Sequence, residues 1–120
     1  MKPQRKPTNR IAKVNSVIQK VVGEAMLPFL DEGPGIVTVS KVEASRDLKW
    51  AKVWISIVGG DDDKIMGLLH KHIYEIQGEL IRTLPMKIIP RIQFFLDTSP
   101  RYVQHIDELI KQIHEEDDSN

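Results

Sequence analysis

The chain of 120 residues is long enough for one domain with a modest core and too short for two, and its 17 basic residues balance 17 acidic ones. It contains no cysteine, which excludes disulfides and thiolate metal sites and is typical of the reducing cytoplasm. No apolar run approaches the roughly 20 residues of a membrane-spanning helix, and no apolar stretch of a signal peptide follows the basic N-terminus, so we expect a soluble cytoplasmic protein without membrane contact.

The charges cancel in number but are separated along the chain. Basic residues precede the first acidic residue, Glu24: Lys2, Arg5, Lys6, Arg10, Lys13 and Lys20. Four of the last six residues, 115–120, are acidic. This separation favours a disordered basic arm over residues 1–7 that binds nucleic acid, one folded domain over residues 8–114, and a solvating acidic tail. Both ends would also suit plain solvated tails.

The first predicted element is an amphipathic helix that begins near Thr8 or Asn9. Its apolar residues recur every three or four positions and so share one face: Ile11, Val14, Val17, Ile18, Val21, Val22 and Ala25. At about 100° per residue, Arg10, Lys13 and Lys20 fall together beside that face. The helix would therefore turn an apolar stripe to the core and a cationic flank to solvent.

Two runs rich in β-branched residues predict an antiparallel hairpin. The first spans residues 36–44, and in the second Ala51, Val53, Ile55 and Ile57 alternate with Lys52, Trp54 and Ser56. Between the runs, Ser45 and Asp47 are suited to bond nearby backbone amides and close the loop. A hairpin with one apolar face is marginal alone in water, so we expect the helices to cover it.

A second helical region follows Gly59 and Gly60. Three aspartates, residues 61–63, stand at its start and complement the helix dipole; a divalent cation site there is disfavoured, because consecutive helical side chains point in different directions. Its predicted buried stripe is Ile65, Leu68, Leu69, His72, Ile73 and Ile76. His70 and His72 are two positions apart and face different sides, so they predict no metal pair.

Gly78 interrupts the same helical region. A glycine there predicts either a bend that breaks the helix or close packing against another element. Basic residues follow at Arg82, Lys87 and Arg91, which leaves open a role for the break in binding nucleic acid.

A third strand and a closing helix complete the chain. Ile92, Phe94 and Leu96 alternate after Pro90, and Ser99 before Pro100 starts a helix with an apolar stripe at Ile106, Leu109, Ile110 and Ile113. The order helix, strand, strand, helix with a glycine break, strand, helix predicts an α+β domain with helices on one face of a three-stranded sheet.

This order resembles the type II KH arrangement, and the hairpin resembles the signature of the ribosome-binding factor A family of bacterial small-subunit assembly factors. Residues 37–56 carry the strongest likeness, and Arg10, residues 90–94, Asp97 with Ser99, and residues 106–109 support it. The family usually carries Ala-x-Gly at the helix break, whereas Ile76 stands two positions before Gly78 here. The segment from that glycine to the third strand is also about one helical turn shorter than usual.

The resemblance implies a cytoplasmic protein that binds the free small (30S) ribosomal subunit and its 16S rRNA and supports processing of that RNA, with no cofactor and no small-molecule substrate. We expect a monomer. The residues also indicate no enzyme, because the sequence shows no nucleophile beside a base, no paired catalytic carboxylates, no phosphate-binding glycine loop and no metal-ligand spacing. One rival is a protein-interaction or dimerising accessory domain that uses the sheet face bearing Trp54 and Phe95; a remote one is a metal-dependent hydrolase that uses residues 61–63 and the histidines.

The predicted RNA-binding surface combines the cationic flank of the first helix with the arm and with the region of the helix break. Its residues are Arg5, Lys6, Arg10, Lys13, Lys20, Arg82, Lys87 and Arg91. They would lie along rRNA phosphates, which position a protein without reading sequence, so selectivity would come from the shape of the immature subunit. A net charge of zero predicts modest affinity for RNA in general and reversible binding.

Overall fold

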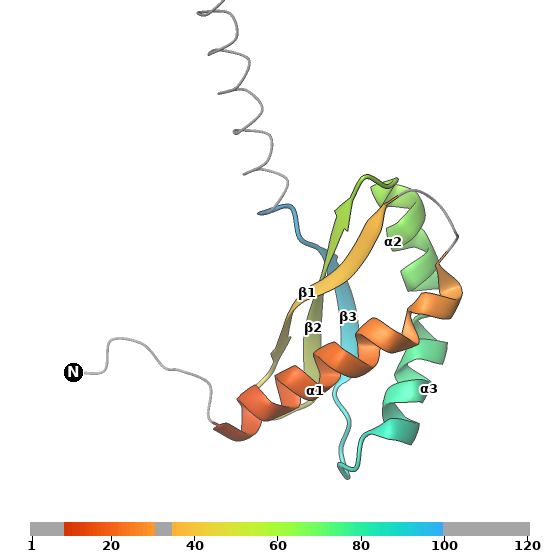
Figure 1. Cartoon of the computed structure of the whole chain (residues 1–120). Coiled ribbons are helices and arrows are strands. Elements are labelled where there is room, and N and C mark those ends of the chain that lie inside the picture. The colour runs from red at the N-terminus through yellow and green to blue at the C-terminus, as the bar shows by residue number, and fades with distance from the viewer. Residues whose placement is uncertain (1–8, 31–34, 100–120) are drawn as a thin grey trace, which may run out of the picture.

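The computed structural model of the chain describes residues 9–30 and 35–99 (Figure 1). In chain order its elements are α1 (Asn9–Ala25), the 3-10 helix η1 (Leu27–Phe29), β1 (Ile36–Ala44), β2 (Trp50–Val58), α2 (Asp62–Lys71), α3 (Ile73–Thr83) and β3 (Arg91–Leu96). This order confirms the predicted α+β, type II KH-like fold. The predicted disordered arm, closing helix and acidic tail lie outside the described residues.

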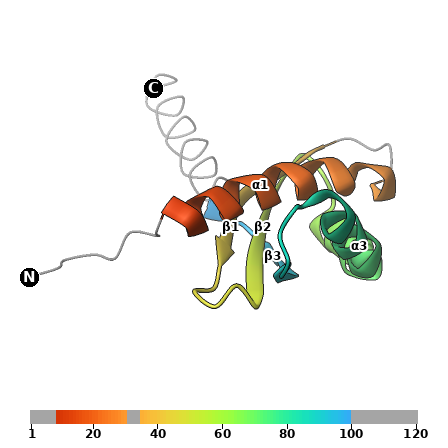
Figure 2. The same cartoon turned by 90° about the horizontal axis from the view of Figure 1, so that it is seen from below.

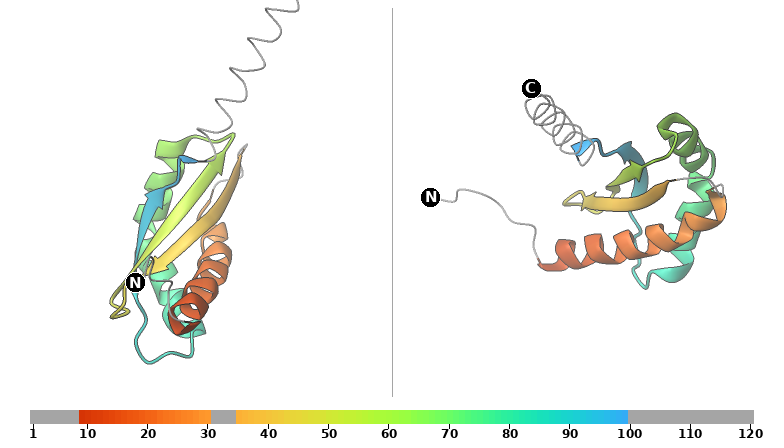
Figure 3. Two further views of the ribbon diagram at one scale, coloured as in Figure 1. Left: turned by 90° about the vertical axis from the view of Figure 1, so that its left-hand side faces the viewer. Right: turned by 45° about the horizontal axis from the view of Figure 1, so that its top comes forward.

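The three strands form one mixed sheet in the order β1-β2-β3. β1 and β2 are antiparallel, as the hairpin prediction required, and β3 runs parallel to β2. A parallel neighbour needs a crossover connection, which α2 and α3 supply. The described helices lie on one side of the sheet (Figures 1 and 2), and Figure 3 (left) shows the strands in front of α2 and α3, with α1 beside them. The sheet therefore has an inner face toward the helices and an outer face.

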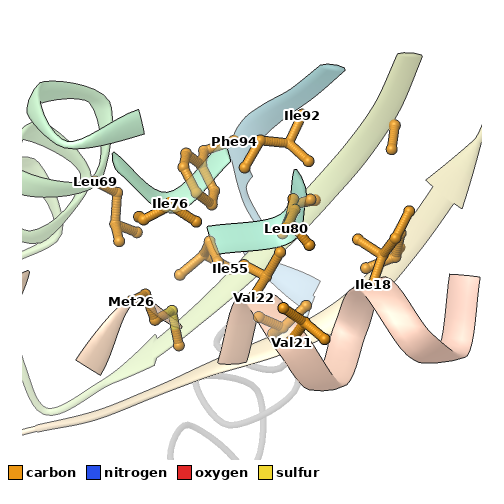
Figure 4. Packing of buried hydrophobic residues seen from close by; sticks show 14 of the residues in the cluster. Ile18, Val21, Val22, Met26, Ile55, Leu69, Ile76, Leu80, Ile92 and Phe94 are labelled. Carbon is orange, nitrogen blue, oxygen red and sulfur yellow. The ribbon is translucent and has the colours of Figure 1, made fainter. Parts of the chain in front are cut away.

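The core lies between the inner face of the sheet and the helices. Ala51, Val53, Ile55 and Ile57 of β2 are all buried, which confirms the alternation read from the sequence. They join Ile18 and Val22 of α1, Ile76 and Leu80 of α3, and Ile92 and Phe94 of β3 in one cluster (Figure 4). Each fully buried aliphatic side chain contributes about 1.5–3 kcal/mol. Val17 is an exception to the predicted stripe of α1: it is 44% exposed, because its position lies about 100° around the helix from Ile18.

The loop between β1 and β2 is closed by the two residues that the sequence indicated. Ser45 Oγ donates to Asp47 Oδ1 at 2.7 Å, and the backbone N–H of Lys49 donates to the same oxygen at 3.1 Å. The backbone N–H of Trp50 in turn donates to Ser45 Oγ at 3.1 Å. The hydrogen bond from Ser45, followed by that from Lys49, lowers the pKa of Asp47 from its usual value. These bonds fix the start of β2 and thereby the outward position of Trp50.

Side-chain amides of α1 bond the backbone of β1, an edge strand of the sheet. Asn15 Oδ1 accepts from the backbone N–H of Ala44 at 2.9 Å, and Gln19 Nε2 donates to the carbonyl of Val39 at 2.9 Å. Both bonds are partly buried, which strengthens them relative to exposed ones. They fix the rotation of α1 over the sheet, so the opposite flank of the helix remains in solvent.

A third side-chain amide bonds the backbone at the start of the other edge strand, β3. Gln77 of α3 donates from Nε2 to the carbonyl of Pro90 at 3.0 Å and accepts at Oε1 from the backbone N–H of Ile92 at 2.9 Å. One side chain thus bonds the backbone on both sides of Arg91. This pair of bonds holds the start of β3 against α3.

The helical region after the hairpin breaks at His72, so the predicted break at Gly78 is wrong. His72 has φ −105° and ψ 18° and separates α2 from α3. Its ring stacks on Phe29 with centroids 4.5 Å apart, and its Nδ1 lies 2.9 Å from Glu75 Oε2. Gly78 lies inside α3, where an added Cβ would meet only the Arg82 side chain, with Nη1 at 3.4 Å. Neither a bend nor a close backbone approach explains this glycine.

Glycine substitutions in helix and turn should have opposite effects on stability. Gly67 lies inside α2, where an added Cβ would have nothing within 4 Å, so Gly67→Ala should raise the free energy of unfolding by about 1 kcal/mol. Gly35 has φ +125° and an added Cβ there would lie 2.9 Å from the Gly60 nitrogen, so Gly35→Ala should lower it by about 1–3 kcal/mol. Urea unfolding of both variants checks the pair, and equal midpoints would contradict the turn geometry.

Candidate nucleic-acid interface

The exposed flank of α1 carries three cations. Arg10, Lys13 and Lys20 are all exposed and fall within an arc of about 80° around the helix axis. None of them has an ion-pair partner among residues 9–30 and 35–99. Asn15 and Gln19 hold the other side of the helix against β1, so this flank faces solvent along its length. We call these three residues the α1 flank.

The α1 flank ends at an acidic groove between α1, η1 and α3. The groove has a volume of about 550 Å³, and Phe29, Tyr74 and Gly78 contribute to its lining. Its carboxylates are Glu24, Glu75 and Glu79. Phosphate is repelled by such a cluster, so the cationic surface of α1 ends near Lys20.

Arg82 lines the same groove but is engaged with a carboxylate. Its Nη2 donates to Glu79 Oε2 at 2.7 Å, one turn earlier in α3. The Arg82 hydrogen bond is the main reason that the pKa of Glu79 lies below its usual value. Arg82 therefore offers less free positive charge than the α1 flank. Lys87 is exposed in the segment that joins α3 to β3.

Arg91 lies on a different surface from the α1 flank, so the predicted single surface is corrected. Ile92 and Phe94 point into the core, and Arg91 therefore points to the outer face of the sheet, away from α1. Its guanidinium lies over the Trp50 ring, 5.7 Å from the centroid. Arg5 and Lys6 lie outside the described residues.

The sequence reasoning placed Lys52, Trp54 and Phe95 outward on the sheet but missed that Trp50 and Arg91 join them on this outer face. Trp50, Lys52 and Trp54 occupy alternate outward positions of β2, and Phe95 of β3 lies beside Trp54. The alternation that identified the inner face carries the signal for this outer set as well. The alternation does not reveal the parallel pairing that places β3 beside β2.

The end of β3 is tied to β1 through a carboxylate. The register of β1 shifts between Val39 and Lys41, and Ser40 Oγ in this bulge donates to Asp97 Oδ2 at 2.7 Å. The backbone N–H of Ser99 donates to Asp97 Oδ1 at 2.9 Å. The Ser40 bond, with the Ser99 bond second, lowers the pKa of Asp97 from its usual value.

Acid should release the Asp97 contact. Because the pKa of Asp97 is lowered in the folded state, its ionised form stabilises the fold above the ordinary aspartate pKa of 3.8 and loses this effect as pH falls through the folded value. We expect the urea midpoint of the wild type to fall between pH 5 and pH 2, and that of Asp97→Asn to fall less. Ser40→Ala should flatten the profile in the same way. An unchanged slope in both variants would contradict the assignment.

The aspartates at residues 61–63 belong to a helix cap. Asp61 Oδ1 accepts from the backbone N–H of Lys64 at 3.2 Å, which confirms their role at the start of α2. Over the described ranges, no group of three His, Cys, Asp or Glu side chains is placed to hold a metal ion. In the same part of the chain, no helix is long and apolar enough to cross a membrane.

Comparisons with known proteins agree on one family. Residues 10–110 match the family model for ribosome-binding factor A. Ribosome-binding factor A of Bdellovibrio bacteriovorus is 32% identical over 114 residues, covering 92% of this chain and 85% of the relative. The crystal structure of ribosome-binding factor A from Thermus thermophilus superposes with a TM-score of 0.63 at 18% identity, covering 72% of this chain and 93% of that one. A homology model of the Thermus protein, fitted into a cryo-EM map of a 30S–RbfA complex, superposes with a TM-score of 0.61 at 18% identity, over 70% of this chain and 91% of that one.

Proposed function

Because the chain belongs to the ribosome-binding factor A family, we propose that it binds the free small (30S) ribosomal subunit and supports maturation of the 16S rRNA. It does so as a cytoplasmic monomer that catalyses no reaction. The Thermus relative has been placed in a 30S complex, which supports the choice of partner.

The observation that carries the proposal is the α1 flank. Arg10, Lys13 and Lys20 are exposed, lie on one side of a rigid helix and are free of carboxylate partners among the described residues. Cations in such a row bind successive phosphates of folded RNA, and they do so without reading base sequence. Lys87 of the α3–β3 segment, which is exposed, and Arg5 and Lys6 at the N-terminal end would add to this charge.

The acidic groove sets the orientation of the protein on RNA. Glu24 and Glu75 repel phosphate at the C-terminal end of α1, whereas Arg82 offsets the charge of Glu79, so the RNA lies over the N-terminal part of this helix. One helix therefore both attracts the subunit and limits how far the contact extends. This limit, together with the zero net charge, favours release once the subunit has matured.

Sedimentation tests the proposal directly. Purified protein should sediment with isolated small subunits, and more with subunits that contain precursor 16S rRNA than with mature ones. Crosslinking from the α1 flank should map to 16S rRNA positions. Absence of the protein from the subunit fraction at low salt would contradict the proposal, and phosphate release with magnesium and nucleotide would contradict the non-catalytic role.

A further inference from the structure

The outer face of the sheet combines aromatic rings with cations. We define it by these outward residues of the three paired strands: Lys41, Glu43, Trp50, Lys52, Trp54, Arg91, Gln93 and Phe95. No described helix covers it (Figure 3, left). Both tryptophans of the chain are in this set.

Aromatic residues lie at two places on the outer face. Trp54 and Phe95 are neighbours in the register of β2 and β3, with ring centroids 5.1 Å apart and planes tilted by 33°. Trp50 lies two outward positions away on β2, with Lys52 between, and is 44% exposed, the more open of the two tryptophans. Trp54 Nε1 is buried and finds no hydrogen-bond acceptor among the described residues, so Trp54 serves as a packed ring and not as a donor. Trp50 is therefore the exposed ring of this face, and Phe95 is half-buried beside Trp54.

One cation lies close to the Trp50 ring and another close to the Phe95 ring. Arg91 Cζ lies 5.7 Å from the Trp50 centroid, and Lys52 Nζ lies 5.9 Å from the Phe95 centroid. Glu43 is opposite Lys52 in the register, but its carboxylate faces Lys41, with Oε2 3.9 Å from Nζ. Within residues 9–30 and 35–99 neither Lys52 nor Arg91 has an ion pair. The positive charge of this face is thus mostly unneutralised.

We propose that the outer face binds unpaired RNA, with a base stacked on the exposed Trp50 ring and phosphates held by Arg91 and Lys52. This rests on the proposed function and extends it from RNA helices to single strands. Base stacking needs an exposed ring, and backbone binding needs a cation within one nucleotide of it, which are the two components of single-strand sites. The α1 flank has the cations but α1 contains no aromatic residue, so it suits paired RNA.

The charge of the outer face argues for RNA over a protein partner. Protein interfaces concentrate apolar area at their centre and place charge at the rim. Here Lys52 lies on the central strand and Arg91 at the start of β3, and each of these cations lies close to an aromatic ring. The exposed apolar pair Ile36 and Val58 lies at the far end of the hairpin and lacks cations.

Tryptophan fluorescence reports on this face alone, because both tryptophans belong to it. Titration with decauridylate at low salt should quench the emission of the full-length protein, whereas a duplex of decauridylate and decaadenylate should bind with little quenching. Lys52→Glu/Arg91→Glu should weaken decauridylate binding about tenfold or more. Trp50→Leu should weaken it by about tenfold, and Trp50→Phe should restore most of the affinity.

The matched control reverses two charges on the α1 flank. Lys13→Glu/Lys20→Glu should weaken duplex binding and leave the quenching by decauridylate unchanged. Decauridylate binding that is insensitive to Lys52→Glu/Arg91→Glu, in a variant with native circular dichroism, would overturn the proposal. Concentration-dependent self-association that Trp50→Leu abolishes would also overturn it and assign the face to protein contact.

The two proposals fail in different experiments. If the protein sediments with small subunits but decauridylate leaves the tryptophan emission unchanged, only the single-strand site is lost. If decauridylate quenches the emission but subunits leave the protein in the supernatant, the ribosomal function is lost and the site remains.

Discussion

Replacing Arg10, Lys13 and Lys20 together by alanine should weaken binding to small ribosomal subunits by at least about tenfold at low salt. Each cation that leaves a phosphate removes roughly 0.7–0.9 from the slope of log affinity against log salt, so the slope should fall by about two to three. The side chains are exposed and contribute nothing to the core, so the fold should remain intact. Sedimentation with subunits at several salt concentrations measures both quantities.

The control for this variant removes charge from another helix. Lys64→Ala/Lys71→Ala takes two exposed cations from α2, outside the α1 flank, and should leave the slope nearly unchanged. If the two variants lose affinity equally, the protein is attracted by its overall charge and α1 has no special role. If neither loses affinity, the RNA contact lies elsewhere.

Ile76→Ala should have the largest effect on stability, a loss of about 2–5 kcal/mol in the free energy of unfolding. Ile76 of α3 is fully buried in the core cluster, where it lies beside Leu69 of α2 and Phe94 of β3 (Figure 4). Deleting its outer carbons leaves a cavity that the rigid surroundings cannot refill. The melting temperature should fall by on the order of 10 °C.

Ile81 provides a matched control in the same helix. It is 59% exposed, so Ile81→Ala deletes the same atoms from solvent and should change stability by less than about 0.5 kcal/mol. Thermal unfolding followed by circular dichroism compares the two variants. Similar melting temperatures would mean that α3 packs on a different face from the one described.

Most of the fold could be predicted from the sequence, because the spacing of the apolar residues decides which side of a helix or strand faces the core. Period two in β2 assigned Ala51, Val53, Ile55 and Ile57 to the core, and all four are buried. The polar loop was also predictable, because Ser45 and Asp47 bond only their near neighbours. Local chemistry sufficed in both cases.

The helix break could not be predicted in this way. Propensity favoured Gly78, yet α3 continues through it and the chain turns at His72. The stack of His72 on Phe29, a residue more than forty positions earlier, accompanies that turn. Contacts this distant in sequence leave no periodic signal.

The cationic surface was predicted only in part, because the helical period is visible in the sequence and the pairing of the strands is not. Arg10, Lys13 and Lys20 follow one helical period, and the structure finds all three exposed on one flank. Arg91 was grouped with them because it follows Arg82 and Lys87 in the chain. The alternation of β3 sends it to the outer face, where the parallel pairing with β2 gives it Trp50 as a neighbour.

The amide contacts at the two sheet edges also affect how the protein behaves at high concentration. A bare strand margin is a template on which a second chain extends the sheet, the first step toward fibrils and domain exchange. Asn15 and Gln19 already occupy backbone groups of β1, and Gln77 occupies those at the start of β3. A second chain must break these bonds before it pairs, so the molecule resists sheet-to-sheet aggregation while its charged and aromatic surfaces stay open to solvent.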